Sequence, residues 1–395
     1  MIWLNLSVII HIDKMILKRN LFLFVSALVL VSCINAQEKQ DKSFNFSLVD
    51  ELVNTAISEK VFPGASLLIW QNGKVIHRNF FGTFTYNSDA QVITDKSIFD
   101  LASLTKVIVT TTAAMICIDR GLFSLDDKVV KFVPEFGANG KENITIRNLL
   151  LHNSGLVAWR KFYGRGLDEF SVIKEIYESS LEFETGTKTV YSDLGIITLG
   201  KIIEIVTGLK LDEFSEKEIF TPLNMISTFY NPLDSLKRLC APTEQDNYWR
   251  NKLLQGEVHD ETAAMLGGIA GHAGLFSTTD DLAKFMTMIM NKGIYENKKI
   301  LDNRTLEMFT KKQTNQSSRG LGWDTKSEKG SSAGDLFSAN SFGHTGFTGT
   351  SIWADPERNL FVVFLTNRVY PSRDNTKIIS FRPKLHNEVI NSISE

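Results

Sequence analysis

Strand-forming segments lie near both ends of the chain, and helical segments fill the region between them. Residues 65–70 and 75–81 flank Asn72-Gly73, which is the strongest short signal for a β-hairpin. Near the C-terminus, residues 351–354 and 360–366 have strand-like patterns on either side of a turn. This arrangement predicts an α/β (α+β) fold. One antiparallel sheet is built from both ends of the chain and flanked by helices, with a helical subdomain inserted between the ends.

Apolar residues at helical spacing mark further elements. They are a helix over 46–60, a long helix from Ser103 to Arg120 that ends at Gly121, a helix from Thr278 or Thr279 to Met290, and a closing helix over 383–393. We expect one domain over 46–395, with a sheet region at about 46–125 and 275–395 and a helical region at about 126–274. The polar stretch 326–334 is expected to be a surface loop.

Residues 1–36 have the pattern of a secretory signal peptide. Lys18 and Arg19 precede the apolar run 21–31, and small residues follow it. The run is too short to span a bilayer, which needs about 20 apolar residues. The chain is therefore expected to be exported to the periplasm or the cell envelope.

Two ways of processing this signal are open. Leu30-Val31-Ser32-Cys33 resembles a bacterial lipobox, which would leave a lipidated Cys33 at the mature N-terminus. Ordinary cleavage before Gln37 is the alternative, and we favour the lipoprotein. Residues 37–45 then form a linker, and the lipid anchor at Cys33 is the only expected contact with a membrane.

Charge and cysteine content exclude several classes of protein. The net charge is -2, and no basic run provides the surface that a nucleic-acid binder needs. The 3 cysteines cannot form a disulfide framework. His259 and its acidic neighbours lack the spacing of a zinc helix, so we expect no metal and no cofactor.

Ser103-Leu104-Thr105-Lys106 begins the long predicted helix. Residues three apart share one helix face, so the hydroxyl and the amine can meet. A serine hydroxyl is a weak nucleophile that needs a neighbouring base. A lysine supplies that base only if burial lowers its pKa. The helix N-terminus also favours a developing oxyanion, so the motif predicts Ser103 as a nucleophile activated by Lys106.

Two other serines match catalytic patterns by letter. Ser171 and Lys174 repeat the Ser-x-x-Lys spacing on a polar stretch. Residues 330–334 match Gly-x-Ser-x-Gly, but without the strand and the helix that this nucleophile motif requires. The first motif is therefore weak by itself, and its weight comes from motifs downstream.

Tyr191-Ser192-Asp193 and His344-Thr345-Gly346 follow the first motif in order. Together the three motifs resemble those of the penicillin-recognising serine hydrolases. The most similar group is the class C β-lactamase-like branch, which also holds D-amino-acid peptidases and esterases. Segments 144–156 and 271–278 resemble that branch as well. The resemblance covers residues from about 47 to the C-terminus and implies a β-lactamase/transpeptidase-like fold.

The resemblance also implies a role for each motif. Ser103 would attack the substrate carbonyl and form an acyl-enzyme, and Lys106 would share its proton. Tyr191 would act as a base in acylation and pass a proton to the leaving group, and His344 would complete the catalytic set. The oxyanion hole would be formed by the backbone N–H groups of Ser103 and Phe347. The residues expected to bind the substrate or the oxyanion are Asp193, Thr345, Gly346 and Phe347.

Two positions depart from the β-lactamase pattern. Asp193 stands where those enzymes carry asparagine, and a carboxylate beside Lys106 would hold the amine protonated. His344 stands in place of a lysine, and a neutral imidazole is a poorer anchor for a substrate carboxylate. Asp193 could also serve as a helix N-cap. His152 and His272 are expected to brace loops.

These observations predict a serine acyl hydrolase of the cell envelope that acts on a small molecule or a peptide. The first hypothesis is a peptidase or amidase on D-amino-acid peptides derived from peptidoglycan, or a β-lactamase. The second is an esterase, which Asp193 and His344 favour. The third is a non-catalytic penicillin-binding sensor on the same fold. The motifs do not choose the substrate, because specificity depends on the shape of the pocket.

Overall fold

The computed structural model describes residues 44–315 and 317–394. The predicted signal peptide, Cys33 and nearly all of the linker lie outside these residues. From Phe46 onward the chain forms one compact unit. Among the helices described, none is both long and apolar enough to cross a membrane.

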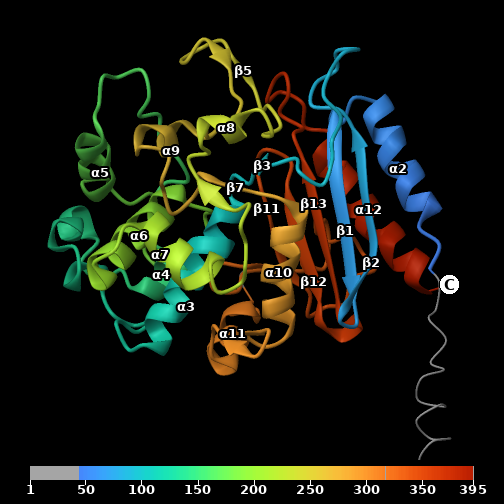
Figure 1. The fold of residues 1–395 in the computed structure, drawn as a ribbon. Coiled ribbons are helices and arrows are strands. Elements are labelled where there is room, and N and C mark those ends of the chain that lie inside the picture. Colours follow the sequence, from blue (N-terminus) through green and yellow to red (C-terminus); the bar gives the residue numbers. More distant parts are fainter. Residues whose placement is uncertain (1–43, 316, 395) are drawn as a thin grey trace, which may run out of the picture. The chain divides into compact units, whose positions relative to one another are not determined.

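One antiparallel sheet is built from both ends of the chain, as the strand pattern predicts (Figure 1). Its 6 strands lie in the order β10-β11-β12-β13-β1-β2. These are β1 (Gly64–Gln71), β2 (Lys74–Gly82), β10 (Asp324–Thr325), β11 (Phe342–Thr345), β12 (Ser351–Asp355) and β13 (Leu360–Thr366). Because β1 pairs with β13 along its length, the two ends of the chain meet inside the sheet. The predicted fold class is confirmed.

The β1–β2 hairpin turns at Asn72-Gly73, as predicted. Both residues have positive φ angles, 51° and 92°. A two-residue turn of this kind matches the twist of the strands, and it favours Asn-Gly because most side chains disfavour positive φ.

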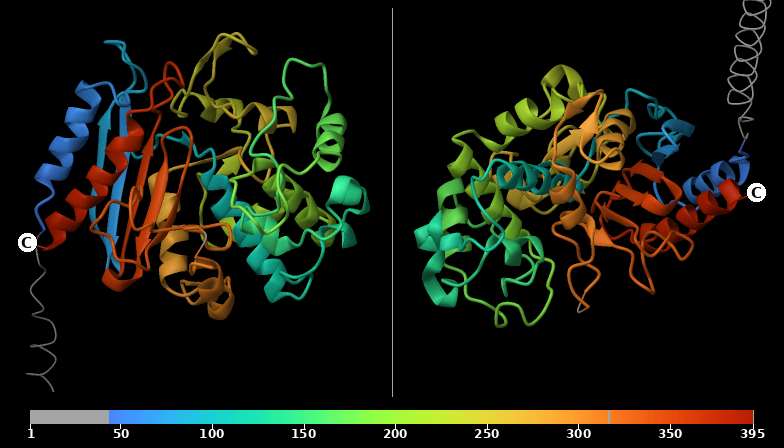
Figure 2. Two further views of the ribbon diagram at one scale, coloured as in Figure 1. Left: turned by 180° about the vertical axis from the view of Figure 1, so that it is seen from behind. Right: turned by 90° about the horizontal axis from the view of Figure 1, so that it is seen from below.

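Helices cover both faces of the sheet (Figures 1 and 2). α2 (Ser47–Ser58) and α12 (Ile378–Ser394) pack together on one face, and α10 (Thr279–Met290) contacts β1 and β13 from the other. Every residue of β13 is therefore buried, and its sequence is apolar without alternation.

The remaining elements lie mostly in the helical region beside the sheet (Figure 1). The helices are α3 (Thr112–Asp119), α4 (Ile146–Leu150), α5 (Glu169–Tyr177), α6 (Asp193–Thr207), α7 (Leu211–Ser215), α8 (Asp234–Lys237), α9 (Glu261–Met265) and α11 (Asn303–Thr310). The short strands are β3 (Phe99–Asp100), β4 (Phe229–Tyr230), β5 (Gln245–Asp246), β6 (Lys252–Leu253), β7 (Leu275–Ser277), β8 (Ile294–Tyr295) and β9 (Lys298–Lys299). A small sheet in the order β3-β7-β4 joins the segment before Ser103 to the helical region.

Two predicted helices differ from the structure in detail. The closing helix begins at Ile378, ahead of the predicted start at Pro383. Proline favours the first turn of a helix, but Pro383 lies inside α12. The Ile379 carbonyl, which loses its hydrogen-bond partner, belongs to an exposed residue. The long helix after Ser103 is π-helical over Lys106–Thr111 before α3 begins. Such stretches are frequent at functional sites.

Candidate active site

Ser103 follows a strained turn at the start of its helix. Ala102 has a φ of 45°, a conformation that costs a residue with a side chain about 1–3 kcal/mol. The buried Asp100 carboxylate at the end of β3 holds this turn. Its Oδ1 accepts a hydrogen bond from Ala102 N at 2.8 Å, and its Oδ2 accepts one from His259 N at 2.7 Å. The turn thus fixes the position of the serine before the helix begins.

Lys106 lies one helical turn further on and is buried beneath Ser103. Its Nζ donates to Ser103 Oγ at 2.8 Å and to the His272 carbonyl at 2.9 Å. Asp193 Oδ1 lies 2.8 Å from the same Nζ. This last contact is an ion pair between the buried ammonium and the carboxylate. The predicted meeting of hydroxyl, amine and carboxylate is therefore present.

The charge state of Lys106 follows from these contacts. Burial disfavours its charged form, but the Asp193 carboxylate and then Tyr191 favour that form more strongly, so the pKa of Lys106 is raised. The serine motif by itself predicts a lysine that burial makes neutral. The structure instead favours a charged Lys106. The expectation that Asp193 holds the amine protonated agrees with the geometry.

Asp193 was also considered as the N-cap of a helix, and this prediction is wrong. Ser192 caps α6, because its Oγ accepts a hydrogen bond from Gly195 N. Asp193 is the first residue inside the helix. Its carboxylate is free to pair with Lys106, because the cap is supplied by the neighbouring serine.

Asp193, Asp260 and His272 are the described residues that could hold a metal ion, with ligand atoms within 4.8 Å of one another. The site already has other partners. Asp193 pairs with the Lys106 ammonium, and His272 Nε2 lies 2.8 Å from Asp260 Oδ1. A metal ion would have to displace the ammonium from Asp193. His272, predicted only to brace a loop, therefore contributes its carbonyl and its ring to the surroundings of Lys106.

Tyr191 is enclosed by two cations and two imidazoles. Lys106 Nζ lies 4.9 Å and Arg319 Cζ lies 5.2 Å from the centre of its ring. The His152 and His344 rings lie at 4.6 Å and 5.9 Å. Burial raises the pKa of Tyr191, and Lys106 opposes that rise. Its buried hydroxyl has no aligned hydrogen-bond partner among the described residues.

Both imidazoles are neutral. Burial, followed by the Arg319 charge, lowers the pKa of His152 and that of His344 well below the usual range. His152 Nδ1 accepts a hydrogen bond from Ser192 N at 3.0 Å, so its proton lies on Nε2. His344 Nδ1 faces the Thr345 carbonyl at 2.9 Å and donates to it, which leaves a lone pair on Nε2. His152 was predicted to brace a loop, and its direct contact with Tyr191 was missed.

The turn after β11 brings Gly346 and Phe347 to Ser103. All three line one cavity of about 400 Å³. Neither the Ser103 N–H nor the Phe347 N–H donates a hydrogen bond to any residue that the structure describes. Gly346 has no room for a side chain, since a Cβ there would lie 2.1 Å from Thr350 Oγ1 and 2.4 Å from the Leu101 carbonyl. Two unused N–H groups thus border the nucleophile, as an oxyanion hole requires.

The cavity is more basic than the sequence motifs predict. Besides Ser103, Tyr191, His344, Thr345, Gly346 and Phe347, it is lined by Arg319, Arg368, Arg373 and Arg382, with Asp324 as the acidic residue among the described lining. Arg368 lies two residues after the end of β13, so a basic residue close to the end of a core strand was the available signal. Arg319 and Arg382 carried no such signal. A second cavity of about 430 Å³, lined by residues of 212–230, contains none of the motif residues.

The alternative serines are not part of this cavity. Ser171 lies on α5, away from the motif residues, and its backbone N–H donates to Asp168. Ser332 Oγ accepts a hydrogen bond from Trp353 Nε1 at 3.1 Å, and its carbonyl accepts one from His386 at 2.7 Å. The stretch predicted to be a surface loop therefore packs partly against β12 and α12 at its C-terminal end.

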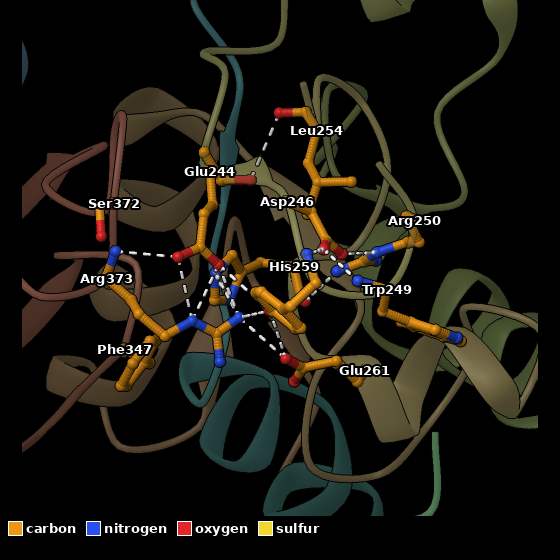
Figure 3. A network of polar contacts seen from close by, with 12 residues as sticks. Glu244, Asp246, Trp249, Arg250, Leu254, His259, Glu261, Phe347, Ser372 and Arg373 are labelled. Carbon is orange, nitrogen blue, oxygen red and sulfur yellow. Dashed lines mark hydrogen bonds and ion pairs between the residues drawn. The ribbon is translucent and has the colours of Figure 1, made fainter. Parts of the chain in front are cut away.

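A network of acids around Arg373 supports the wall that carries Phe347 (Figure 3). Glu244 accepts hydrogen bonds from Arg373 Nε and Nη2 at 2.8 and 2.6 Å. Its Oε2 lies 3.0 Å from His259 Nε2, and Glu261 Oε1 accepts from Arg373 Nη2 at 2.8 Å. His259 in turn stacks on the Phe347 ring, with 5.5 Å between the ring centres. Burial raises the pKa of Glu244, but the His259 and Arg373 hydrogen bonds outweigh it and the pKa is lowered.

Glu244→Gln is expected to lower the free energy of unfolding by about 2 kcal/mol near pH 7, because it leaves the Arg373 charge with one acid fewer. The folded-state pKa of Glu244 lies below its value in the unfolded chain. Its stabilising effect is therefore present above the unfolded pKa and is lost as the pH falls through the folded one. Urea unfolding at a series of pH values measures this difference.

Glu257→Gln is the matched control. Glu257 pairs with Lys252 at 2.7 Å, but both side chains are exposed, so the change should stay below about 0.5 kcal/mol. Equal losses in the two variants would contradict a supporting role for the Glu244 network.

The family model described as "Beta-lactamase" matches residues 48–382. The chain is 33% identical over 371 residues to the "N-acetylmuramyl-L-alanine amidase" of Bacillus subtilis (strain 168), covering 85% of this chain and 83% of that protein. It is 31% identical over 352 residues to the "Putative D-alanyl-D-alanine carboxypeptidase" of Escherichia coli (strain K12), covering 79% and 80%.

Among solved structures, "EstCE1, a hydrolase with promiscuous acyltransferase activity" has the same fold. The TM-score is 0.70 at 20% identity, and the match covers 87% of this chain and 97% of that one. The family match spans all three sequence motifs and the cavity residues that they bring together. The chain therefore belongs to the beta-lactamase family and is a serine hydrolase of that family.

Proposed function

We propose that this protein hydrolyses amide bonds in peptides derived from peptidoglycan, through an acyl-enzyme formed at Ser103. The observation that carries the proposal is the contact of Ser103 Oγ with the Lys106 ammonium, which Asp193 holds in place. Relatives named as an amidase and as a carboxypeptidase support an amide substrate. Arg319 and Arg368 line the cavity, and their positive charges suit a substrate with a carboxylate group, because guanidinium groups bind carboxylates well.

We infer that Lys106 and Tyr191 act together as the base that accepts the proton of Ser103. At neutral pH the lysine is charged and the tyrosine is protonated, because both pKa values are raised. Lys106 donates to Ser103 Oγ, so the serine proton must leave toward an acceptor. Loss of one proton from the Lys106–Tyr191 pair creates that acceptor. The pair then accepts the proton of Ser103 as Oγ attacks the carbonyl carbon.

The same proton completes the reaction. The tetrahedral intermediate carries its negative charge toward the Ser103 and Phe347 N–H groups. As the carbon–nitrogen bond breaks, the pair returns the proton to the leaving amine. Water then attacks the ester carbon and gives its proton to the pair. As the bond to Ser103 Oγ breaks, the pair passes this proton to Oγ, which releases the acid and free Ser103. No residue changes its net protonation over the cycle.

Asp193→Asn is expected to shift the acid limb of the kcat/KM profile to lower pH. The Asp193 charge raises the pKa of both Lys106 and Tyr191, so its removal allows the pair to lose a proton more readily. The measurement is a pH–rate profile of wild type and variant. Asp260→Asn, whose carboxylate contacts His272, is the control and should shift the limb less. An unshifted limb in Asp193→Asn would contradict the proton balance given above.

Export is part of the proposal, since peptidoglycan and its fragments are found at the cell envelope. We propose the periplasm or the cell envelope as the location, with a lipid anchor at Cys33 as the favoured attachment. Labelling with a palmitate analogue in wild type and Cys33→Ala separates the two kinds of processing. Incorporation that persists without Cys33 would rule out this anchor.

A substrate panel tests the proposed reaction directly. It contains a muramyl-L-alanyl peptide, an acyl peptide ending in D-alanyl-D-alanine, a chromogenic cephalosporin and a nitrophenyl ester. We expect Ser103-dependent turnover of one of the two amides to exceed that of the cephalosporin. Turnover of the ester alone would favour an esterase. Stable labelling by a fluorescent penicillin without release would favour a sensor.

A further inference from the structure

The turn that carries the Phe347 N–H is held by a buried arginine without an acidic partner. Arg382 lies on α12 and is 6% exposed. Its Nη2 donates to the Gly346 carbonyl at 2.9 Å and to the Thr350 carbonyl at 2.8 Å. No acid among the described residues forms an ion pair with it. Burial, followed by the nearby Arg368 charge, lowers the pKa of Arg382 to about 9.

The Gly346 carbonyl and the Phe347 N–H belong to one peptide unit. That peptide is trans, so its C=O and N–H bonds point to opposite sides of the chain. A donor that fixes the carbonyl on one side therefore fixes the direction of the N–H on the other. The Phe347 N–H donates to no described residue, and it borders the cavity that contains Ser103.

We propose that Arg382 is a positioning residue of the oxyanion hole, which aims and polarises the Phe347 N–H through the Gly346 carbonyl. The guanidinium draws electron density toward that carbonyl oxygen, and this strengthens the N–H of the same peptide as a donor. Arg382 touches neither the nucleophile nor the reacting carbonyl. The inference rests on the proposed acyl-enzyme at Ser103.

Closure of the turn does not need this arginine. Gly346 N donates to the Thr350 carbonyl at 2.8 Å, and Gly349 N donates to the Gly346 carbonyl at 3.1 Å. Thr348 and Thr350 hydroxyls tie the turn to the Asp100 and Leu101 carbonyls at 2.7 and 3.0 Å. A buried cation without an acid is costly, and neutral contacts already shape the turn. What Arg382 adds is a charged donor to the Gly346 carbonyl, which shares its peptide with the Phe347 N–H.

Arg382→Lys and Arg382→Met test this role in the full chain. Lysine keeps the charge but cannot span both carbonyls in the same way, and methionine removes the charge. We expect kcat to fall by about 10-fold in the first and about 100-fold in the second, with KM changed far less. The affinity for a boronic acid that forms a tetrahedral adduct with serine should fall in parallel with kcat. A merely structural role would not link these two quantities.

Asn387→Ala is the control on the same helix. Its side chain accepts hydrogen bonds from Asp335 N at 2.8 Å and Leu336 N at 3.1 Å, outside the cavity. This variant should lower the melting temperature without a parallel loss of kcat and boronate affinity. If Arg382→Met does not fold, Arg382→Lys decides the question. Wild-type kcat and boronate affinity in folded Arg382→Lys would overturn the inference.

A fluorophosphonate probe separates this inference from the proposed function. The rate at which the probe reacts with Ser103 also depends on the oxyanion hole. This rate can be measured before the natural substrate is known. Labelling that persists in Ser103→Ala would overturn both proposals. Ser103-dependent labelling at an unchanged rate in the Arg382 variants would overturn this inference alone.

Discussion

Ser103→Ala is expected to abolish acyl-enzyme formation and to lower kcat by about 10⁴- to 10⁶-fold, which is the range seen when a nucleophilic serine is removed. The loss is this large because, among the described residues, Ser103 supplies the serine hydroxyl that accepts a hydrogen bond from the Lys106 ammonium. Folding should be little affected, because Ser103 is half-buried and follows a turn that Asp100 holds. Covalent labelling followed by intact-mass measurement checks the prediction, together with turnover of the best amide.

Ser171→Ala is the matched control. Ser171 and Lys174 have the same sequence spacing as the catalytic pair, but Lys174 is exposed on α5 and faces Glu178 at 3.8 Å. This variant should label and turn over at the wild-type rate. If Ser171→Ala lost labelling while Ser103→Ala kept it, the assignment of the nucleophile would be wrong.

Lys106→Met is expected to lower kcat by about 10³-fold, since a general acid–base group contributes about 10²- to 10⁴-fold and the cation also orients Ser103. The variant should lose about 1–3 kcal/mol of stability as well, because Asp193 keeps its charge without a partner. The pKa of Lys106 is raised by folding. Its stabilising effect is therefore fully present below the pKa of the unfolded lysine, and lost only as the pH rises through the folded one.

A double variant separates the two effects of Lys106. Lys106→Met combined with Asp193→Asn removes both charges, so stability should recover relative to the single Lys106 variant while activity should not. Urea unfolding and turnover of the same samples give both quantities. Recovery of activity along with stability would show that the lysine acts only through folding.

Lys141→Met provides a second comparison. Lys141 is also fully buried, and its Nζ donates to the Ala138 carbonyl at 2.6 Å and to the Ser179 carbonyl. It lies in the helical region, outside the cavity that contains Ser103. Its replacement should lower stability without affecting kcat. Loss of activity in Lys141→Met would mean that any buried lysine has this effect.

Strands β1, β2, β12 and β13 were predictable because their signals are local, whereas the short strands β10 and β11 were not predicted. Asn72-Gly73 determines the turn of the β1–β2 hairpin through the backbone angles that these residues accept. The unbroken apolar run of β13 reflects burial on both faces. The start of α12 was not predictable, because proline at position 383 reads as a helix start unless the packing of the preceding turn is known.

The candidate site also has features that follow from the sequence and features that only the structure shows. Ser103 and Lys106 share one helix face, so their contact follows from spacing in the chain. The sequence suggests that Asp193 keeps Lys106 protonated. The structure places the two groups 2.8 Å apart, and at this distance the carboxylate raises the pKa of Lys106 more than burial lowers it. Contacts between residues far apart in the chain, such as Glu244 with Arg373, leave no pattern in a single sequence.

The sequence by itself determined the fold class, the nucleophile motif and the order of the three motifs, because hydrophobic period, turn chemistry and residue spacing are local properties. The tertiary structure alone decided the charge of Lys106, the neutrality of His344, the basic cavity and the place of Arg382 behind Gly346. Those features depend on burial and on distances between side chains from different elements. Both are set only when strands from the two ends of the chain pair in one sheet and the helical region packs beside it.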